Sequence, residues 1–168
     1  MKKMPIHNID PVYDKKSEIL ILGSFPSVKS RQIRFFYGHP QNRFWKTMAA
    51  VYEDEVPESI EDKKSFLLRH RVAVWDVIES CEIKGSSDSS ISNVKVNDIN
   101  RIIKNSRITR IFVNGRTAEK YYKKYLEKST GLKAIVLESS SPANARYSLT
   151  DLIDDWKEKI KEDSNNDL

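Results

Sequence analysis

The sequence predicts an α/β fold, in which helices cover both faces of a four-stranded parallel sheet. Four short apolar runs alternate with segments that carry apolar residues at helical spacing, and the connections between them are short. Three of the four runs end in polar, turn-forming clusters, which read GSFPS, NGRT and SSSPANAR. Because the carboxyl ends of parallel strands lie at one edge of a sheet, we expect these clusters to face a common cleft.

The strands are predicted where apolar residues follow one another directly, a pattern typical of strands buried on both faces. They cover residues 19–22, 72–78, 108–113 and 134–137. Asp76 lies at or near the carboxyl end of the second strand. The first strand breaks at Gly23 and leads directly into the GSFPS turn.

Helices are predicted over residues 41–52, 60–70, 97–105 and 116–128, and a last helix reaches about Ile160. Ser148 or Thr150 can cap the last helix, whose apolar residues share one face. Two loops separate these elements. Residues 35–40 are rich in aromatic side chains, and residues 84–93 form a Ser/Gly-rich stretch of low complexity.

The length of 168 residues predicts one domain over residues 1–168, with a frayed tail at 163–168. The composition, 39% hydrophobic and 32% charged, is that of an ordinary globular protein. No apolar run approaches the ~20 residues that span a membrane. No apolar signal-peptide core follows the first lysines. We therefore expect a cytoplasmic protein without membrane contact.

The cysteine and histidine content argues against a metal centre. The single cysteine, Cys81, excludes an internal disulfide and a four-cysteine site, and its place after an apolar run favours a core thiol. The three histidines are scattered and form no HExxH motif. The net charge of +5 permits binding to a polyanion without establishing it.

Several familiar catalytic motifs are absent from the sequence. There is no G-x-G-x-x-G and no P-loop, so dinucleotide or nucleoside triphosphate binding lacks its phosphate cradle. There is no G-x-S-x-G elbow and no acid–histidine pairing that indicates a serine hydrolase.

The cleft instead contains amide side chains, flat aromatic rings and hydroxyl groups. A carboxamide presents a donor and an acceptor, so it can read the edge of a nucleobase. An aromatic face can stack on a base that has left the duplex, and serine hydroxyls can hold phosphates. The amides are Asn42, Asn114 and Asn144, and the aromatic residues are Phe25, Phe35, Phe36 and Tyr37.

Each of these residues also has a purely structural interpretation. Asn42 can cap a helix, Phe35 and Phe36 can belong to the core, and Asn114 can simply tolerate a turn. Taken together at three strand ends, the residues favour a pocket for a flipped base.

These motifs resemble those of the uracil-DNA glycosylase superfamily. GSFPS, FFYGHPQNRFW, VNGRTA and LESSSPANARYSL occur in the family's order and spacing, over roughly residues 18–160. The likeness is greatest to its hypoxanthine-DNA (deoxyinosine) glycosylase branch, with the mismatch-specific uracil/thymine glycosylases next. The resemblance implies a three-layer α/β/α sandwich around a four-stranded parallel sheet. It also implies a monofunctional glycosylase without a metal or other cofactor.

The resemblance assigns roles to the residues of these motifs. The GSFPS turn is similar to the family's first motif, which lies against the target nucleotide, and Tyr37 falls where mismatch-specific enzymes stack an aromatic ring on the flipped base. The base-binding residues implied are Gly23, Ser24, Phe25 and Tyr37. The second motif implies phosphate contacts from two serines, and minor-groove contacts from the residues after them. These DNA-binding residues are Ser140, Ser141, Pro142, Ala143, Asn144 and Arg146.

The first motif departs from the pattern of many relatives, which have Asp or Asn there to position the attacking water. This chain has Phe25, which cannot orient water, so uracil excision by that route is in doubt. In the hypoxanthine branch the catalytic amide is the asparagine of HPxNxFW, which is Asn42 in this chain. The resemblance also implies that Asn114 occupies the strand-end position that faces the base edge, so the predicted catalytic residues are Asn42 and Asn114.

We therefore expect a DNA glycosylase that flips deoxyinosine and hydrolyses its N-glycosidic bond in base excision repair. Its partner is double-stranded DNA that contains a deaminated base, and we expect a monomer. Two alternatives remain open. One is a mismatch-specific uracil/thymine glycosylase, and the other is a catalytically silent nucleic-acid-binding module on the same fold.

Overall fold

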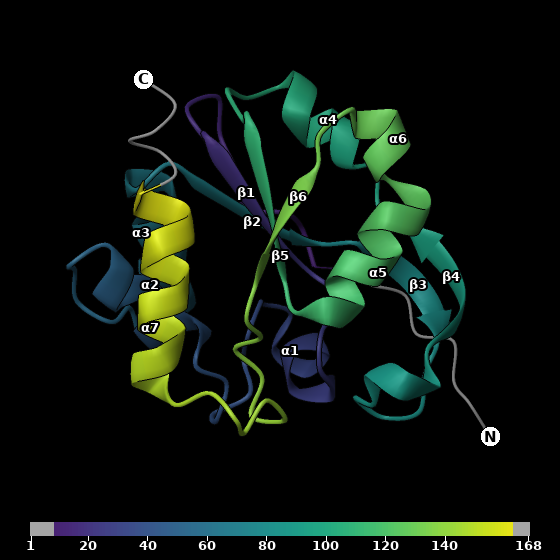
Figure 1. The fold of residues 1–168 in the computed structure, drawn as a ribbon, viewed down its shortest axis with the longest axis horizontal. Coiled ribbons are helices and arrows are strands. Elements are labelled where there is room, and N and C mark those ends of the chain that lie inside the picture. The colour runs from purple at the N-terminus through teal and green to yellow at the C-terminus, as the bar shows by residue number, and fades with distance from the viewer. Residues whose placement is uncertain (1–8, 163–168) are drawn as a thin grey trace.

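The computed structural model describes residues 9–162 and places a four-stranded parallel sheet between layers of helices (Figure 1). The sheet order is β2-β1-β5-β6, and every pair of neighbouring strands is parallel. The predicted fold class is therefore confirmed. The four strands are β1 (Ile19–Gly23), β2 (Val72–Asp76), β5 (Arg110–Asn114) and β6 (Ala134–Leu137).

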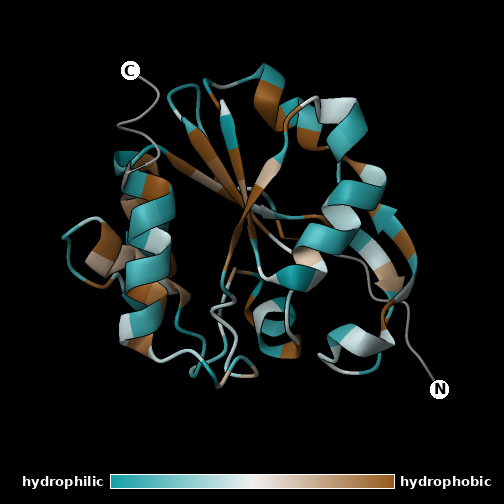
Figure 2. Ribbon diagram, in the orientation of Figure 1, coloured by the Kyte–Doolittle hydropathy of each residue, from teal (hydrophilic) through white to brown (hydrophobic). Residues whose placement is uncertain are grey.

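Strands β1 and β2 are buried because other parts of the chain cover both faces of the sheet. Every residue of β1 and of β2 is buried, in agreement with their continuous apolar sequences. Figure 2 shows these strands as hydrophobic, whereas the helices around them carry hydrophilic outer faces.

Helices lie on both sides of the sheet in Figure 1. One side carries α2 (Phe44–Val51), α3 (Ile60–Arg69) and α7 (Leu149–Lys157). The other side carries α4 (Ile99–Lys104), α5 (Arg116–Tyr125) and α6 (Glu127–Thr130).

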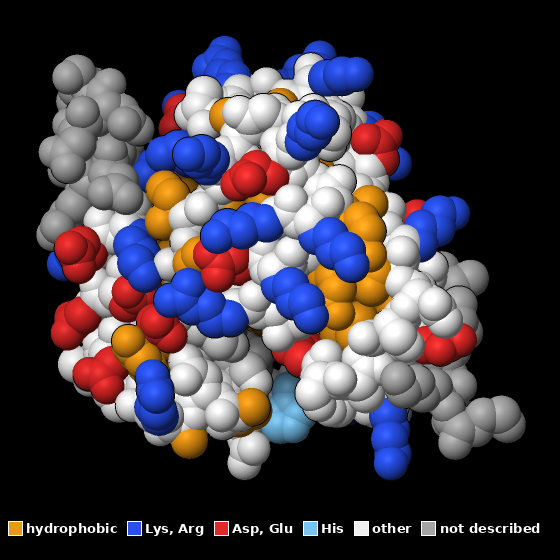
Figure 3. Space-filling model, turned by 45° about the vertical axis from the view of Figure 1, so that its right-hand side comes forward, with side chains coloured by type: hydrophobic (Ala, Val, Ile, Leu, Met, Phe, Trp, Pro, Cys, Tyr) orange, Lys and Arg blue, Asp and Glu red, His pale blue; other side chains and the backbone are white. Residues whose placement is uncertain are grey.

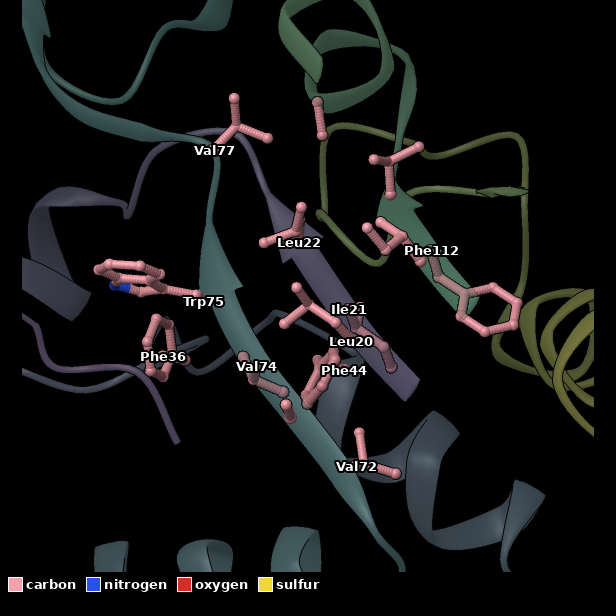
Figure 4. Close-up of a cluster of buried hydrophobic side chains, with 14 of the residues drawn as sticks. Leu20, Ile21, Leu22, Phe36, Phe44, Val72, Val74, Trp75, Val77 and Phe112 are labelled. Carbon is pink, nitrogen blue, oxygen red and sulfur yellow. The ribbon is translucent and has the colours of Figure 1, made fainter. Parts of the chain in front are cut away.

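Aromatic side chains of the core connect the sheet with α2 and α7. Phe44 of α2 packs edge-to-face against Trp156 of α7, with 5.7 Å between ring centroids. Figure 4 shows Phe44 among side chains of β1 and β2, including Leu20 and Val74. The indole Nε1 of Trp156 donates to the carbonyl of Glu138 at 2.8 Å. This bond ties α7 to the segment that follows β6.

The second apolar run, predicted as one strand over residues 72–78, is divided in the structure. β2 ends at Asp76, and the next residues run alongside the turn after β1, where Val77 N donates to Gly23 O at 2.8 Å. β3 (Ile78–Glu82) then pairs with β4 (Ser92–Val96) in an antiparallel ribbon outside the main sheet. The prediction of a single strand was wrong because both pieces are apolar, and an apolar run gives no sign of a change of partner.

The polar sequence of β4 explains why the ribbon was not predicted. Its residues are exposed or half-buried, so it lacks the apolar run by which the other strands were recognised. The short helix α1 (Val28–Ile33) was also missed, because it contains only two apolar residues in an otherwise polar segment. The Ser-rich loop contains a single 3₁₀ turn, η1 (Asp88–Ser90), within the predicted loop.

The helix boundaries differ from the predictions by a few residues at several ends. α2 begins at Phe44 instead of residue 41, because the preceding residues form a turn in which Asn42 N donates to His39 O at 3.0 Å. The helix predicted over residues 116–128 breaks at Leu126 and continues as α6. The last helix, α7, passes into a π-helical turn, η2 (Glu158–Glu162).

Cys81 is a buried residue of β3, as predicted for a core thiol. Burial raises the pKa of this thiol to about 11, which keeps it protonated and unreactive at neutral pH.

None of the helices within residues 9–162 is long and apolar enough to cross a membrane.

The order of the strands creates a crevice between β1 and β5. The chain leaves β1 towards β2 on one side, whereas it leaves β5 towards β6 on the other side. In open α/β sheets, ligands bind outside the carboxyl ends of strands at such a switch point. Gly23 ends β1 and Asn114 ends β5, so both residues lie at this crevice.

The cap of α7 provides a test of the local structure. Ser148 Oγ accepts from Asp151 N at 3.1 Å, and Asp151 Oδ2 accepts from Ser148 N at 3.0 Å, which completes a capping box. Ser148→Ala should lower the free energy of unfolding by about 1 kcal/mol and the melting temperature by roughly 3 °C. Thr150→Ala, within the same helical turn, is the control. An equal loss in both variants would contradict the assignment of Ser148 as the cap.

Candidate functional site

A cavity of about 370 Å³ lies at the carboxyl edge of the sheet, over the crevice between β1 and β5. Its walls come from the GSFPS turn, the aromatic loop up to Asn42, the end of β2 and the Ser-rich loop. Asn114 and residues 139–143 form the rest of the wall. The three polar clusters predicted to share a cleft therefore do so. A cavity of this volume is within the range of sites for small ligands.

Gly23 allows two functional groups to approach the end of β1. A Cβ atom at this position would lie 2.4 Å from Asp76 Oδ1 and 3.1 Å from Tyr37 Oη. Because real side chains do not tolerate such distances from buried neighbours, the strand has to end in glycine here. The buried carboxylate of Asp76 and the hydroxyl of Tyr37 thus reach the floor of the cavity.

The hydroxyl of Ser140 connects the two predicted catalytic amides. Asn114 Nδ2 donates to Ser140 Oγ at 3.0 Å, and Ser140 Oγ donates to Asn42 Oδ1 at 2.8 Å. Ser140 is fully buried. Residues 42, 114 and 140, which are remote in the sequence, therefore form one hydrogen-bonded chain at the site.

Backbone N–H groups fix the orientation of both amides. Phe44 N donates to Asn42 Oδ1 at 3.0 Å, and Ser140 N donates to Asn114 Oδ1 at 3.0 Å. Since a backbone N–H can only donate, the oxygen of each carboxamide must face it. The oxygen of Asn42 accepts two hydrogen bonds, so its remaining capacity is the Nδ2 donor.

Arg43 holds the segment after β6 against the aromatic loop. Its guanidinium donates to the carbonyls of Ser141 at 2.8 Å and Asn144 at 3.0 Å, and also to that of Tyr147. Its backbone N–H donates to Ser140 O at 3.1 Å. Arg43 was not among the predicted site residues, although its position directly after Asn42 in HPQNRFW could have indicated that it lies at the site.

Tyr37 combines a stacked ring with a buried hydroxyl. The residue has φ +53°, and its ring stacks on Phe44 with 4.0 Å between centroids. Its hydroxyl is buried and lies close to Asp76 and to the side chain of Asn114. Burial and the charge of Asp76 raise the pKa of this phenol well above its usual value, so it remains protonated. Phe44 covers one face of the ring, and the residue lines the cavity.

The other aromatic residues form apolar walls. Phe25 is buried at the edge of the cavity, and the guanidinium of Arg31 lies 5.3 Å from its ring centroid. Phe35 and Phe36 belong to the hydrophobic core, as their structural interpretation predicted, although Phe36 also contributes to the cavity wall.

The predicted DNA-binding residues differ in their exposure, from exposed side chains to the fully buried Ser140. Pro142, Ala143 and Arg146 are exposed, and Ser141 is half-buried. Asn144 turns its amide inward, where Nδ2 donates to Ser139 O at 3.0 Å. Ser140 does not occupy a position that suits the predicted phosphate contact, because its hydroxyl is buried between Asn42 and Asn114.

The Ser-rich loop contributes Ser86 and Asp88 to the cavity wall, a role that the sequence did not reveal. Val28 N donates to Ser86 Oγ at 3.0 Å, and the Arg31 guanidinium donates to Gly85 O at 2.8 Å. Ser24 Oγ approaches Asp88 Oδ1 at 3.4 Å, which connects the loop to the GSFPS turn.

Charge alone does not mark the binding side of the molecule. Figure 3, which turns the α5 side towards the viewer, shows Lys and Arg side chains across this face with Asp and Glu side chains between them. No group of three or more His, Cys, Asp or Glu residues within positions 9–162 is arranged to hold a metal ion.

Comparisons with known proteins agree with the motifs and the fold. The family model of the uracil DNA glycosylase superfamily matches residues 11–165. A protein from Methanosarcina acetivorans named hypoxanthine DNA glycosylase is 36% identical over 139 residues, which are 82% of this chain and 87% of that protein. A protein of the same name from Methanosarcina barkeri is 30% identical over 154 residues, 90% of this chain and 95% of that protein.

A solved structure has the same architecture. It is the solution NMR structure of a Methanosarcina acetivorans protein that was proposed to be a uracil DNA glycosylase. It superposes with a TM-score of 0.75 and 32% sequence identity, and the match covers 89% of this chain and 94% of that one. The chain therefore belongs to the uracil DNA glycosylase superfamily, as its motifs predicted.

Proposed function

We propose that this protein is a DNA glycosylase that removes hypoxanthine from deoxyinosine in double-stranded DNA. The observation that carries the proposal is the chain from Asn114 through Ser140 to Asn42, which fixes amide donors at a cavity walled by aromatic rings. The names of the relatives from Methanosarcina support hypoxanthine as the base.

The target nucleotide has to leave the duplex before it can enter the cavity. Flipping costs a few kcal/mol, and least where the base is mispaired. Pro142 and Ala143 are exposed and line the cavity, and Arg146 is exposed shortly after them in the chain, so these residues can occupy the space that the base vacates or contact the backbone. Tyr37, Phe25 and Phe36 provide the apolar and aromatic surface that receives the base.

The reaction breaks the bond between C1′ of the sugar and N9 of the base. The electron pair of this bond leaves with the base, which gains negative charge, while the sugar gains oxocarbenium character. Water then adds to C1′ and supplies the proton that the base takes up, so the products are an abasic site and hypoxanthine. Donors aimed at the developing charge of the base lower the barrier.

Asn42 is suited to stabilise the departing base. Its oxygen already accepts from Phe44 N and Ser140 Oγ, so its Nδ2 group is the part that can act on a ligand. Donation from Nδ2 to the base stabilises the anion, whereas activation of water would require the occupied oxygen. Asn114 supports this donor through Ser140 and presents a further amide hydrogen.

The first test concerns the substrate. Phe25 cannot orient a water molecule, so we expect faster single-turnover cleavage of an inosine-containing duplex than of a uracil-containing one. The abasic product is detected by strand cleavage in alkali. Faster release of uracil or thymine would favour the mismatch-specific alternative, and binding without release of any base would favour a silent binding module.

The second test separates catalysis by Asn42 from its structural role. Asn42→Asp retains an oxygen for Phe44 N but removes the Nδ2 donor, so the single-turnover rate on inosine should fall on the order of 10²–10³-fold. Asn42→Ala should lose a similar factor in rate and, in addition, about 0.5–2 kcal/mol of stability.

Thermal melting on the same preparations tests whether both variants are folded. Asn100→Ala is the matched control, because Asn100 lies on α4, away from the cavity. Retention of wild-type excision by Asn42→Asp would mean that donation from Nδ2 is not required.

The third test concerns a proposed DNA contact of Arg146, which is exposed and forms no ion pair with the described residues. Each neutralised phosphate contributes about −0.9 to the slope of log K against log salt. Arg146→Ala should therefore make the slope shallower by roughly one unit. Lys104→Ala, an exposed cation at the end of α4, should leave the slope unchanged. The same slope in wild type and Arg146→Ala would exclude a phosphate contact for this arginine.

A further inference from the structure

Asp88 is a carboxylate at the rim of a cavity that would receive part of a polyanion. It lines the cavity together with Asn42 and Asn114, although part of the residue is exposed to solvent. Within the described residues, no lysine, arginine or histidine forms an ion pair with it. A carboxylate without a cation at such a place is a candidate for a functional role.

The loop that carries Asp88 is held in place in spite of its Ser/Gly-rich composition. Ser90 Oγ accepts from Lys84 N at 2.8 Å and donates to Ser87 O at 2.7 Å, which closes the loop on itself. Ser86 and Gly85 bond to α1, as described above. These contacts give the carboxylate a defined position in the wall of the cavity that Asn42 and Asn114 also line.

The carboxylate can accept further hydrogen bonds. Ser24 Oγ donates to Oδ1 over a long distance of 3.4 Å, and the side chain of Thr117 also interacts with the carboxylate. Because the two oxygens together offer about four acceptor sites, capacity remains for an N–H group of a ligand. Loss of hydration raises the pKa of Asp88, while hydrogen bonds from Thr117 and Ser24 act in the opposite direction. An N–H group of a ligand would replace the lost hydration.

We propose that Asp88 is a specificity-determining residue that accepts a hydrogen bond from the ring N–H of a deaminated purine and thereby rejects adenine. This inference rests on the proposed function. Deamination replaces the 6-amino group of adenine by an oxygen and converts N1 from an acceptor into an N–H donor. A donor such as Asn42 Nδ2 together with the acceptor Asp88 therefore matches hypoxanthine, whereas adenine presents the reverse pattern at both positions.

The fixed orientation of the amides makes this selection possible. A freely rotating carboxamide could turn its oxygen towards the amino group of adenine. Asn42 and Asn114 cannot do so without breaking bonds from Phe44 N and Ser140 N. A carboxylate, in turn, cannot donate to N1 of adenine. Unpaired polar groups in such a site discriminate strongly against the wrong ligand.

The experiment compares single-turnover excision from two duplexes, one with 2′-deoxyinosine and one with 2′-deoxynebularine. Nebularine has an acceptor at N1, as adenine has, and carries no group at C6. Asp88→Asn should reduce the rate on inosine about ten- to hundredfold and change the rate on nebularine much less. The ratio of the inosine rate to the nebularine rate should therefore be at least about tenfold lower in the variant than in the wild type. Because both proteins act on the same two substrates, the intrinsic lability of each glycosidic bond cancels in this comparison.

Asp98→Asn is the matched control, since Asp98 is an exposed carboxylate that precedes α4 and does not line the cavity. Asp88→Ala, checked by thermal melting, should show the same fall in the ratio as Asp88→Asn. If Asp88 only repelled DNA or supported its loop, the rates on inosine and on nebularine would change by the same factor. An unchanged ratio of these two rates would overturn the inference and leave the proposed function intact. A wild-type enzyme that releases no hypoxanthine would overturn the proposed function, and this inference with it.

Discussion

The site depends on the buried hydroxyl of Ser140, which donates to Asn42 and accepts from Asn114. A buried hydroxyl without partners would be costly, whereas here both its donor and an acceptor position are satisfied by the site itself. The directions of these bonds are consistent with one another, because backbone N–H groups determine which end of each amide is the oxygen. The buried hydroxyl of Ser140 thus helps to hold the amide donors of Asn42 and Asn114 in fixed directions at the cavity.

The strand order and the loop contacts of the fold bring Asn42, Asn114 and Ser140 together. The strand order β2-β1-β5-β6 opens a crevice between β1 and β5, and Asn114 lies at its edge because it ends β5. Gly23 lets Asp76 and Tyr37 approach the same edge. Arg43 fastens residues 141–147 to the loop that carries Asn42, so both sides of the hydrogen-bonded chain are held. Such preorganisation allows a donor to act without first moving into place.

The walls of the cavity are consistent with the proposed selection between bases. Phe25 supplies apolar surface at the position where many relatives are expected to have a water-orienting residue. The Ser-rich loop adds the carboxylate of Asp88, the proposed acceptor. Aromatic surfaces accept any base, so selection has to come from these few polar groups and from their fixed directions.

The sequence by itself determined the parallel sheet, the convergence of three strand ends and the candidate amides, because continuous apolar runs and terminal turn residues are local signals. It could not show that the chain changes sheets after Asp76, since the run over residues 72–78 is apolar on both sides of this residue. Only the tertiary structure showed that Ser140 is buried, and that Asp88 lines the same cavity as Asn42. These relations join residues about 46 to 98 positions apart, and they depend on strand order and loop packing, which no local pattern encodes.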